Sequence, residues 1–294
     1  MKRCSACQTE FAAADWKCPA CAFMPSSING FPALAPDLAQ GGAGFPPEAF
    51  EYLAAVEAQN FWFQARNRLI VWALKKHFPS MKRYLEIGCG TGYVLAGVAQ
   101  AYPGATLVGS EVFSVGLPFA ASRVSSVELL QLDARHIPYV EEFDVIGAFD
   151  VIEHIKEDEA VLAAMLAALR PGGGVAITVP QHPWLWSSAD DHACHERRYR
   201  IGELREKVLR AGFKLEFETS FVSLLLPAML ASRLNKGQTK EQAKGVDETK
   251  SEFNLPPWLN RAFEIIMDFE RSLIRMGLRF PLGGSRLLIA TKKR

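Results

Sequence analysis

The stretch Leu85-Glu-Ile-Gly-Cys-Gly-Thr-Gly-Tyr-Val-Leu95 decides the fold of this chain. It predicts a short buried strand that ends in a glycine-rich turn, with a helix beginning directly after the turn. Gly88, Gly90 and Gly92 remove every Cβ from the turn, so a ligand can lie directly against the backbone. A dinucleotide fingerprint has the spacing G-x-G-x-x-G, whereas these glycines alternate with single residues.

An acidic residue precedes this turn. Glu86 stands two positions before the first glycine, where a carboxylate would repel a diphosphate but suits a cationic, amine-bearing ligand. This favours a sulfonium nucleoside over NAD. The run resembles motif I of the class I S-adenosylmethionine-dependent methyltransferases. The resemblance implies that Glu86, Gly88, Cys89, Gly90 and Gly92 bind S-adenosylmethionine.

Strand-like and helical segments alternate from Tyr84 onward. Repeated strand–helix units imply a parallel sheet with helices on both faces. The resemblance implies an α/β, Rossmann-like, seven-stranded methyltransferase sheet, mostly parallel, with the last strand antiparallel. The predicted strands are Tyr84–Ile87, Thr106–Ser110, Val127–Leu132, Val145–Phe149, Gly174–Val179, Phe213–Phe221 and Arg286–Thr291.

Acidic residues also follow the second and third predicted strands. Glu111, before Val112, ends the second strand, where its carboxylate can accept hydrogen bonds from both hydroxyls of a ribose. The alternative for Glu111 is a solvated strand end. Asp133 and Ala134 follow the third strand, where the family places an Asp that binds the adenine amino group. The alternative for Asp133 is a helix N-cap.

Two further segments extend the resemblance. Phe149-Asp-Val-Ile-Glu-His154 is similar to the family's segment after strand four, which implies that Asp150 lines the methionine end and that His154 covers the cofactor. Phe61-Trp-Phe-Gln-Ala-Arg66 resembles the lid helix of ubiquinone-pathway-like O-methyltransferases, and Arg66 would pair with the methionine carboxylate. The alternatives are a structural histidine and a surface arginine.

The segment after the fifth strand carries the candidates for catalysis. It resembles bacterial methyltransferases with a Pro-x-x-x-x-Leu-Trp-Ser…Asp…His-x-Arg-Arg-Tyr signature, whose substrates are in general undefined. Methyl transfer from a sulfonium needs positioning and, for an acidic acceptor, removal of a proton. Histidine is the natural base for a hydroxyl, so we select His195 first and His182 second. The alternative is that His195, Arg198 and Tyr199 merely brace the loop by hydrogen bonds.

Two C-x-x-C pairs open the chain. Cys4, Cys7, Cys18 and Cys21 can complete a tetrahedral four-thiolate site, and no secretion signal precedes them to favour disulfides. We predict a structural zinc ion, with iron as the alternative metal. A segment this short has little core, so the metal would supply most of its folding energy.

The domain organisation follows from these motifs. We expect a zinc ribbon over 1–24, a Pro/Gly-rich linker over 25–47 and a methyltransferase domain over 48–294, with the cofactor half at 84–180. A single helical pattern covers about 48–77. An insertion on the substrate side spans 222–284, and its last helix carries an apolar stripe that we interpret as core or interface. Contact with a membrane surface through 224–284 is the alternative. The stripe comprises Ala262, Ile266, Phe269, Leu273 and Met276.

The composition of the chain limits the classes of function that we expect. The net charge of +1 gives no electrostatic case for a nucleic-acid partner. No signal peptide or apolar run of about 20 residues is visible, so we expect a cytoplasmic protein. We predict a methyltransferase acting on a small-molecule or lipid-like acceptor, at oxygen. The alternatives are an RNA methyltransferase that uses the ribbon for recognition, and a non-catalytic cofactor-binding protein.

Overall fold

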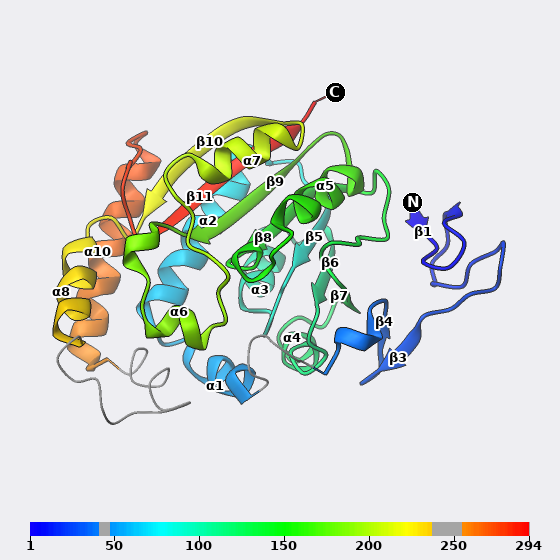
Figure 1. Ribbon diagram of the computed structural model, residues 1–294, viewed down its shortest axis with the longest axis horizontal. Helices are drawn as coiled ribbons and strands as arrows, with labels where there is room; N and C mark the ends of the chain where they lie inside the picture. Colours follow the sequence, from blue (N-terminus) through cyan, green and yellow to red (C-terminus); the bar gives the residue numbers. More distant parts are fainter. Residues whose placement is uncertain (41–47, 237–254, 294) are drawn as a thin grey trace.

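A mixed sheet forms the centre of the computed structural model (Figure 1). The structure describes residues 1–40, 48–236 and 255–293. Its main strands are β5 (Arg83–Ile87), β6 (Thr106–Glu111), β7 (Val127–Gln131), β8 (Phe143–Phe149), β9 (Leu169–Pro180), β10 (Phe213–Phe221) and β11 (Ser285–Lys292). They lie in the order β10-β11-β9-β8-β5-β6-β7.

The pairing confirms the predicted fold class. β5 pairs in parallel with β6 and β8, and the parallel arrangement continues to β7 and β9. The last strand, β11, is antiparallel to both of its neighbours, β9 and β10. The carboxyl ends of the parallel strands therefore meet at one edge of the sheet, the edge where sheets of this type bind ligands.

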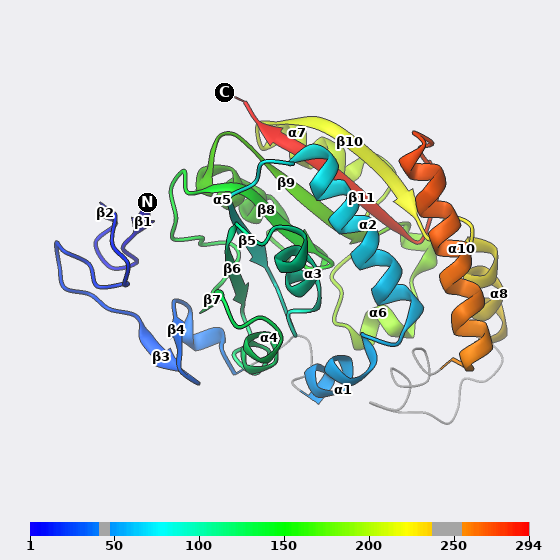
Figure 2. The same ribbon diagram turned by 180° about the vertical axis from the view of Figure 1, so that it is seen from behind.

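Helices cover both faces of the sheet (Figures 1 and 2). On one face lie α2 (Phe61–His77), α3 (Tyr93–Ala101), α4 (Leu117–Arg123) and α10 (Pro257–Arg275), and on the other lie α5 (Asp158–Ala168) and α7 (Glu203–Arg210). Alternate strand residues serve the two cores, as in β5, where Tyr84 faces one and Leu85 the other. Since both faces are buried, the central strands are almost continuously apolar.

The helix predicted over 48–77 is in fact two helices, so that prediction is wrong. α1 (Glu48–Val56) ends before 57–60, and α2 begins at Phe61. Asn60 makes the break, because its side chain accepts a hydrogen bond of 2.9 Å from the Trp62 backbone N–H and so caps the start of α2. The shorter elements near the site are α6 (Ser188–His192), η2 (Ile152–His154) and η3 (Pro183–Leu185).

The segment predicted as a linker over 25–47 instead contributes to the sheet. β3 (Ser26–Ile28) and β4 (Phe31–Ala33) form a hairpin, and β4 extends the sheet beside β7 to give nine strands. The side chain of Gln131 holds this segment on the sheet. It accepts a hydrogen bond from the Ala35 N–H at 3.0 Å and donates one to the Ala35 carbonyl at 2.8 Å. Residues 41–47 lie outside the described part.

The cysteine-containing segment is docked on the main domain. It holds β1 (Lys2–Arg3) and β2 (Glu10–Phe11), and the Arg3 N–H donates to the Pro138 carbonyl at 2.9 Å. Trp16 is buried in the main core, 5.4 Å from the ring of Tyr139, and its indole N–H donates to Glu128 at 3.2 Å. The ribbon and the sheet therefore share a core.

The last helix of the insertion buries a different face from the one that the predicted stripe indicates. It contains α8 (Leu226–Lys236) and α10, while 237–254 lie outside the described residues. The buried face of α10 is formed by Met267, Glu270 and Ile274, whereas Phe269 and Met276 are exposed. The packed face is thus rotated away from the predicted one. Among the helices that the structure describes, none is long and apolar enough to cross a membrane.

Candidate functional site

The glycine turn lies at the carboxyl end of β5, as predicted. Gly88, Gly90 and Gly92 all have positive φ, a conformation that residues with a Cβ rarely adopt. A Cβ on Gly88 would lie 2.5 Å from a Val151 methyl carbon, so this glycine permits close packing. A Cβ on Gly90 would meet nothing nearer than Phe50 at 4.0 Å, so this is the open position of the turn. Cys89, between them, is buried.

Glu86 is deeply buried beside the turn. The hydroxyl of Tyr84 donates a hydrogen bond of 3.0 Å to its carboxyl group. Burial raises the pKa of Glu86 to about 8, although the Tyr84 hydrogen bond and the charge of Arg66 act in the opposite direction. The carboxyl is therefore poised to ionise when a cation binds near it, which fits the predicted amine-bearing ligand.

Glu111 holds the turn from the end of β6. Its two carboxyl oxygens accept hydrogen bonds from the backbone N–H groups of Gly90 (3.0 Å) and Phe113 (3.1 Å). Glu111 is buried, so it is not a solvated strand end. The carbonyl of Val112 accepts from Gln131 at 2.9 Å, which ties this turn to the N-terminal segment. A cavity of about 270 Å³ lies between that segment and the residues that follow Phe113.

Asp133 follows β7, next to the buried Ala134. Its carboxylate accepts hydrogen bonds from the backbone N–H of Arg135 at 2.9 Å and from the guanidinium of the same residue at 3.0 Å. These hydrogen bonds and those from His136 hold the pKa of Asp133 below its ordinary value, against the opposing effect of burial. Asp133 thus caps a turn, but no helix follows it before β8. Its predicted contact with adenine remains a prediction.

Arg66 and Asp150 form a buried ion pair with 2.6 Å between Nε and the carboxylate. The same guanidinium donates to the Phe149 carbonyl at 2.8 Å and lies 4.8 Å from the centre of the Trp62 ring. Arg66 is therefore not a free surface arginine. Asp150 adopts a positive φ of 57°, a strained conformation that is typical of functional sites. α2 and the turn after β8 thus meet through Arg66 and Asp150, and the predicted contact of Arg66 with the methionine carboxylate stays a prediction.

His195 is oriented by an aspartate that the sequence prediction missed. Nδ1 of His195 lies 2.8 Å from a carboxylate oxygen of Asp190, which is fully buried. Arg198 donates to the same oxygen at 2.6 Å, and the Ser187 N–H donates to the other at 2.8 Å. Hydrogen bonds from His195 and Arg198 outweigh burial and hold the pKa of Asp190 at about 2. A capping box from Ser187 to Asp190 was the available sequence signal.

His154 lies against the Asp190–His195 pair, which we call the dyad. Its ring centre is 4.7 Å from that of His195, in an edge-to-face arrangement. Burial, followed by the charge of His195, lowers the pKa of His154 to about 4, so its ring is neutral near pH 7. His154 therefore covers one side of His195 without competing for a proton.

Glu153 is a second residue that the sequence prediction missed. It is fully buried, and neither carboxyl oxygen has a hydrogen-bond partner among the described residues. Burial and the neighbouring charge of Asp150 raise the pKa of Glu153 well above its ordinary value. Ligand atoms of Glu153, His154 and His195 lie within 4.8 Å of one another, so the cluster could also hold a metal ion.

His182 has a less favourable setting. It is buried with a positive φ of 67°, and its ring stacks on Trp184 with 4.9 Å between centres. Burial lowers its pKa, and Nε2 has no partner within the described chain. The bracing interpretation holds for the neighbouring Tyr199, whose hydroxyl donates to Asp158 at 2.7 Å.

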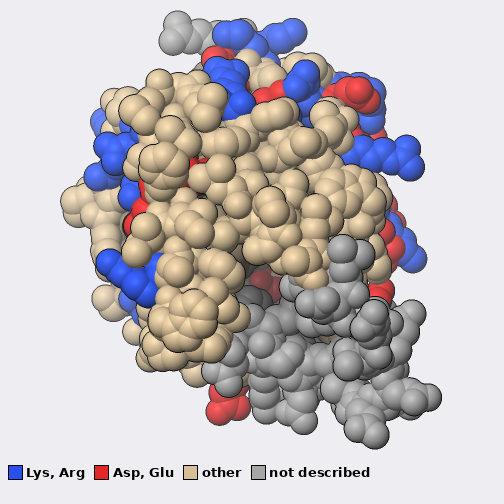
Figure 3. Space-filling model, turned by 90° about the vertical axis from the view of Figure 1, so that its left-hand side faces the viewer, with Lys and Arg blue, Asp and Glu red and all other residues tan. Residues whose placement is uncertain are grey.

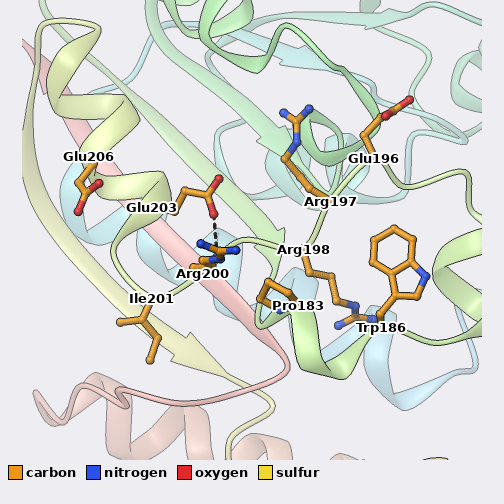
Figure 4. Close-up of a pocket in the computed structure, with 9 residues that line it drawn as sticks. All are labelled: Pro183, Trp186, Glu196, Arg197, Arg198, Arg200, Ile201, Glu203 and Glu206. Atoms are coloured by element: carbon orange, nitrogen blue, oxygen red, sulfur yellow. Dashed lines mark hydrogen bonds between the residues drawn. The ribbon is translucent and has the colours of Figure 1, made fainter.

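A cavity of about 620 Å³ lies beside Arg198, the arginine that pairs with Asp190 (Figure 4). Arg198, which binds Asp190, forms part of its wall and points toward Pro183 and Trp186. Arg200 and Glu203 lie together on another wall, where the Arg200 N–H donates to Glu203 at 3.0 Å. The cavity thus combines apolar and charged walls. It is lined by Pro183, Trp186, Glu196, Arg197, Arg198, Arg200, Ile201, Glu203 and Glu206.

The four N-terminal cysteines form a compact cluster. Sγ of Cys4 lies 3.7 Å from that of Cys21, and Sγ of Cys7 lies 3.6 Å from that of Cys18. A tetrahedral zinc site with Zn–S bonds of about 2.3 Å has S–S edges of about 3.8 Å. The spacing of the thiols therefore fits a four-thiolate zinc ion.

Comparison with known proteins agrees with this geometry. Residues 55–217 match a family model described as "Methyltransferase domain". The ubiquinone biosynthesis O-methyltransferase of Agrobacterium fabrum is 27% identical over 195 residues, covering 60% of this chain and 73% of the relative. The corresponding protein of Pseudomonas fluorescens is 30% identical over 111 residues, covering 35% of this chain and 46% of the relative.

A solved structure shares the fold. Phosphoethanolamine N-methyltransferase 2 of Haemonchus contortus, in complex with S-adenosyl-L-methionine, superimposes with a TM-score of 0.51 at 19% identity. The match covers 76% of this chain and 52% of that one. The chain spans 61%, 36% and 46% of the length of the first three curated relatives it matches.

Proposed function

This chain belongs to the methyltransferase-domain family, and from that premise we propose that it transfers a methyl group from S-adenosylmethionine to a small-molecule or lipid-like acceptor at oxygen. The observation that carries the choice of oxygen is the Asp190–His195 dyad at the carboxyl edge of the sheet. A hydroxyl must lose a proton as it is methylated, and a histidine held by a carboxylate is suited to take it.

The donor site is supported by the residues of the glycine turn. S-adenosylmethionine supplies an electrophilic methyl group when it is bound. The open position at Gly90 leaves room for a ligand against the backbone, and Glu111 is fixed beside it by two backbone hydrogen bonds. Glu86 provides a buried acid that a cationic amine would ionise. Asp133, Arg66 and the other predicted cofactor residues keep their assigned roles as part of this proposal.

His195 would act as the base. Its Nδ1 faces the Asp190 carboxylate, so in the neutral ring this nitrogen carries the proton and Nε2 is left to accept one. Asp190 is paired with Arg198 and remains ionised across the physiological range, so it can stabilise the imidazolium that forms. The adjoining cavity at Arg198 and Trp186 would receive the acceptor.

The thiol cluster would hold a structural zinc ion. Trp16 and the backbone of Arg3 join the ribbon to the main domain, so the metal would stabilise both parts. The basic residues of the ribbon are partly used within the protein. Lys2 donates to two backbone carbonyls at 2.9 Å, and Arg3 pairs with Glu10. This disfavours RNA recognition by the ribbon.

Two measurements test the proposal. Calorimetry should detect S-adenosylmethionine binding by the purified protein, with a known family member as positive control, and absence of binding would refute the donor assignment. Metabolite profiling of a deletion strain with an isotopically labelled methyl donor should then reveal the acceptor. A labelled methyl group found on nitrogen or carbon would overturn the assignment to oxygen.

Variants separate base catalysis from bracing. His195→Gln should retain S-adenosylmethionine binding and lose turnover by about 100-fold or more, the usual contribution of a positioned base. Ser188→Ala is a matched control on the same loop, because the Ser188 contact with His192 uses only a backbone carbonyl. Equal activity of His195→Gln and this control would remove His195 from the chemistry.

A further inference from the structure

An apolar face covers the insertion on the outside of the molecule. Fifteen large hydrophobic side chains are strongly exposed in the described part of the chain, and eight of them lie between 224 and 282. Figure 3 shows this face as a broad area free of charged side chains, with charges gathered at its rim. The eight are Leu224, Leu230, Trp258, Ile265, Phe269, Met276, Leu278 and Leu282.

Helical spacing explains how α10 exposes so many of them. Trp258, Ile265, Phe269 and Met276 are separated by seven, four and seven residues, so they share one side of the helix. Their exposed fractions are 72%, 56%, 58% and 75%. The opposite side packs inward and includes Met267. α10 is therefore apolar on two sides, and only one of them is covered within the described protein.

The start of α8 and the residues just before it continue the face. Leu224, Pro227, Ala228, Leu230 and Ala231 are all exposed, and none of them carries a charge. Exposed apolar surfaces of this extent on a protein surface mark sites of association.

The charges that border the face identify the partner. Arg261, Arg275 and Arg279 are exposed beside the face. Of the acids of α10, Glu264 pairs with Arg68 and Arg261, and Asp268 pairs with Arg68 and Arg271. The third acid, Glu270, is fully enclosed. The exposed rim of α10 is therefore mainly cationic. A second copy packed through the same face would place this arginine rim against an identical one, which is unfavourable. A lipid surface with anionic headgroups satisfies both the rim and the apolar side chains.

We propose that the α8–α10 face, defined by the eight side chains given above, binds the surface of an anionic membrane. The side chains of α10 lie in the boundary between headgroups and acyl chains, with the helix parallel to the surface. Trp258 is suited to that boundary because its ring is apolar and its N–H is polar. This property is independent of which acceptor the enzyme methylates.

Vesicle co-sedimentation of the full chain tests the proposal. The wild type should sediment with vesicles of phosphatidylcholine and phosphatidylglycerol, and more weakly with phosphatidylcholine alone. The double variant Ile265→Ser, Phe269→Ser should partition at least about tenfold less, because each lost side chain removes apolar area from the contact. Leu209→Ser, an exposed leucine on α7 outside the face, is the matched control.

The possible results distinguish a lipid surface from a second copy of the chain as the partner of this face. Both variants should keep the melting temperature and S-adenosylmethionine affinity of the wild type, because the replaced side chains are exposed. Arg275→Gln should weaken binding to phosphatidylglycerol vesicles and reduce its dependence on salt. Absence of wild-type sedimentation with either vesicle would overturn the proposal. Sedimentation velocity that shows a dimer broken by the double variant, without vesicle binding, would assign the face to a second copy.

Discussion

The ionisation of Glu86 should control how tightly the protein binds S-adenosylmethionine. Glu86 is enclosed beside the glycine turn, with the Tyr84 hydroxyl 3.0 Å away, and burial raises its pKa to about 8. Below that pH the side chain is mostly protonated in the ligand-free protein. A cationic amine bound nearby favours the ionised form, so binding should release a proton.

The size of the effect follows from the pKa. Ionising Glu86 costs about 1.4 kcal/mol for every pH unit below about 8. The dissociation constant should therefore fall about tenfold per pH unit, or about 100-fold between about pH 6 and about pH 8. Above about pH 8 the ligand's own α-amino group loses its proton, so the affinity should decline again.

Calorimetry in two buffers with different enthalpies of ionisation measures both the affinity and the released proton. The wild type should release close to one proton per ligand between about pH 6 and about pH 7. Glu86→Gln is the matched control, because it keeps the shape of the side chain and cannot ionise. A wild-type affinity that is independent of pH, without proton release, would refute the reasoning.

Folding stability should respond to the same group. The pKa of Glu86 is higher in the folded state than its ordinary value of 4.5, so the folded protein retains a proton that the unfolded chain loses. Stability should therefore fall as pH rises from about 4.5 to about 8, by about 1.4 kcal/mol per unit within that window. Glu86→Gln should lack this part of the pH dependence in urea denaturation.

The remaining predictions concern four other contacts. Glu111→Ala removes the carboxylate that fixes the glycine turn and that we assign to the ribose hydroxyls, so the dissociation constant for S-adenosylmethionine should rise about 30-fold or more in calorimetry, and an unchanged value would remove Glu111 from the ribose site. Asp190→Asn should lower kcat about 100-fold or more with little change in cofactor affinity, since it disturbs the orientation of His195. Trp16→Ala should destabilise the protein by about 3–5 kcal/mol in urea denaturation, whereas a negligible change would mean that the ribbon is not docked. Cys4→Ser should abolish the zinc found by elemental analysis of the wild type, and a metal-free wild type would end the zinc assignment.

The sequence predicted the sheet well because its strands are buried on both faces. Leu85 and Ile87 are buried in β5 together with Tyr84, with only Glu86 between them polar, and the glycine turn marks where β5 ends. The hairpin of β3 and β4 escaped prediction because Pro, Gly and Ser dominate its composition. Its place in the sheet depends on Gln131, about a hundred residues further along the chain. The residues next to the hairpin in the sequence give no indication of such a contact.

The residues on the acceptor side of the site could also be predicted only in part from the sequence. His195 was predicted from its residue type, whereas Asp190 acquires its importance from three contacts that only the folded loop creates. The bracing alternative included Arg198, but its partner, Asp190, could not be predicted because it depends on how the loop turns back beside β9. Glu153 was missed for a related reason, since an acidic residue in a short motif gives no sign of complete burial.

The charges of the site together suit methyl transfer from a sulfonium. Several acids line the site, and ion pairing and burial act on them differently. Asp150 pairs with Arg66 and Asp190 pairs with Arg198, while burial favours the protonated forms of Glu86, Glu111 and Glu153. The site therefore holds two internal ion pairs and little uncompensated charge.

This balance has a consequence for the chemistry. If the acceptor hydroxyl gives its proton to His195 as it takes the methyl group, the positive charge of the sulfonium would pass to the imidazolium, which the Asp190 carboxylate would stabilise. His154, neutral because its pKa is about 4, adds a further uncharged wall beside His195. Ionisation of Glu86 on binding would place a new negative charge at the amine end of the cofactor and away from the reacting methyl group.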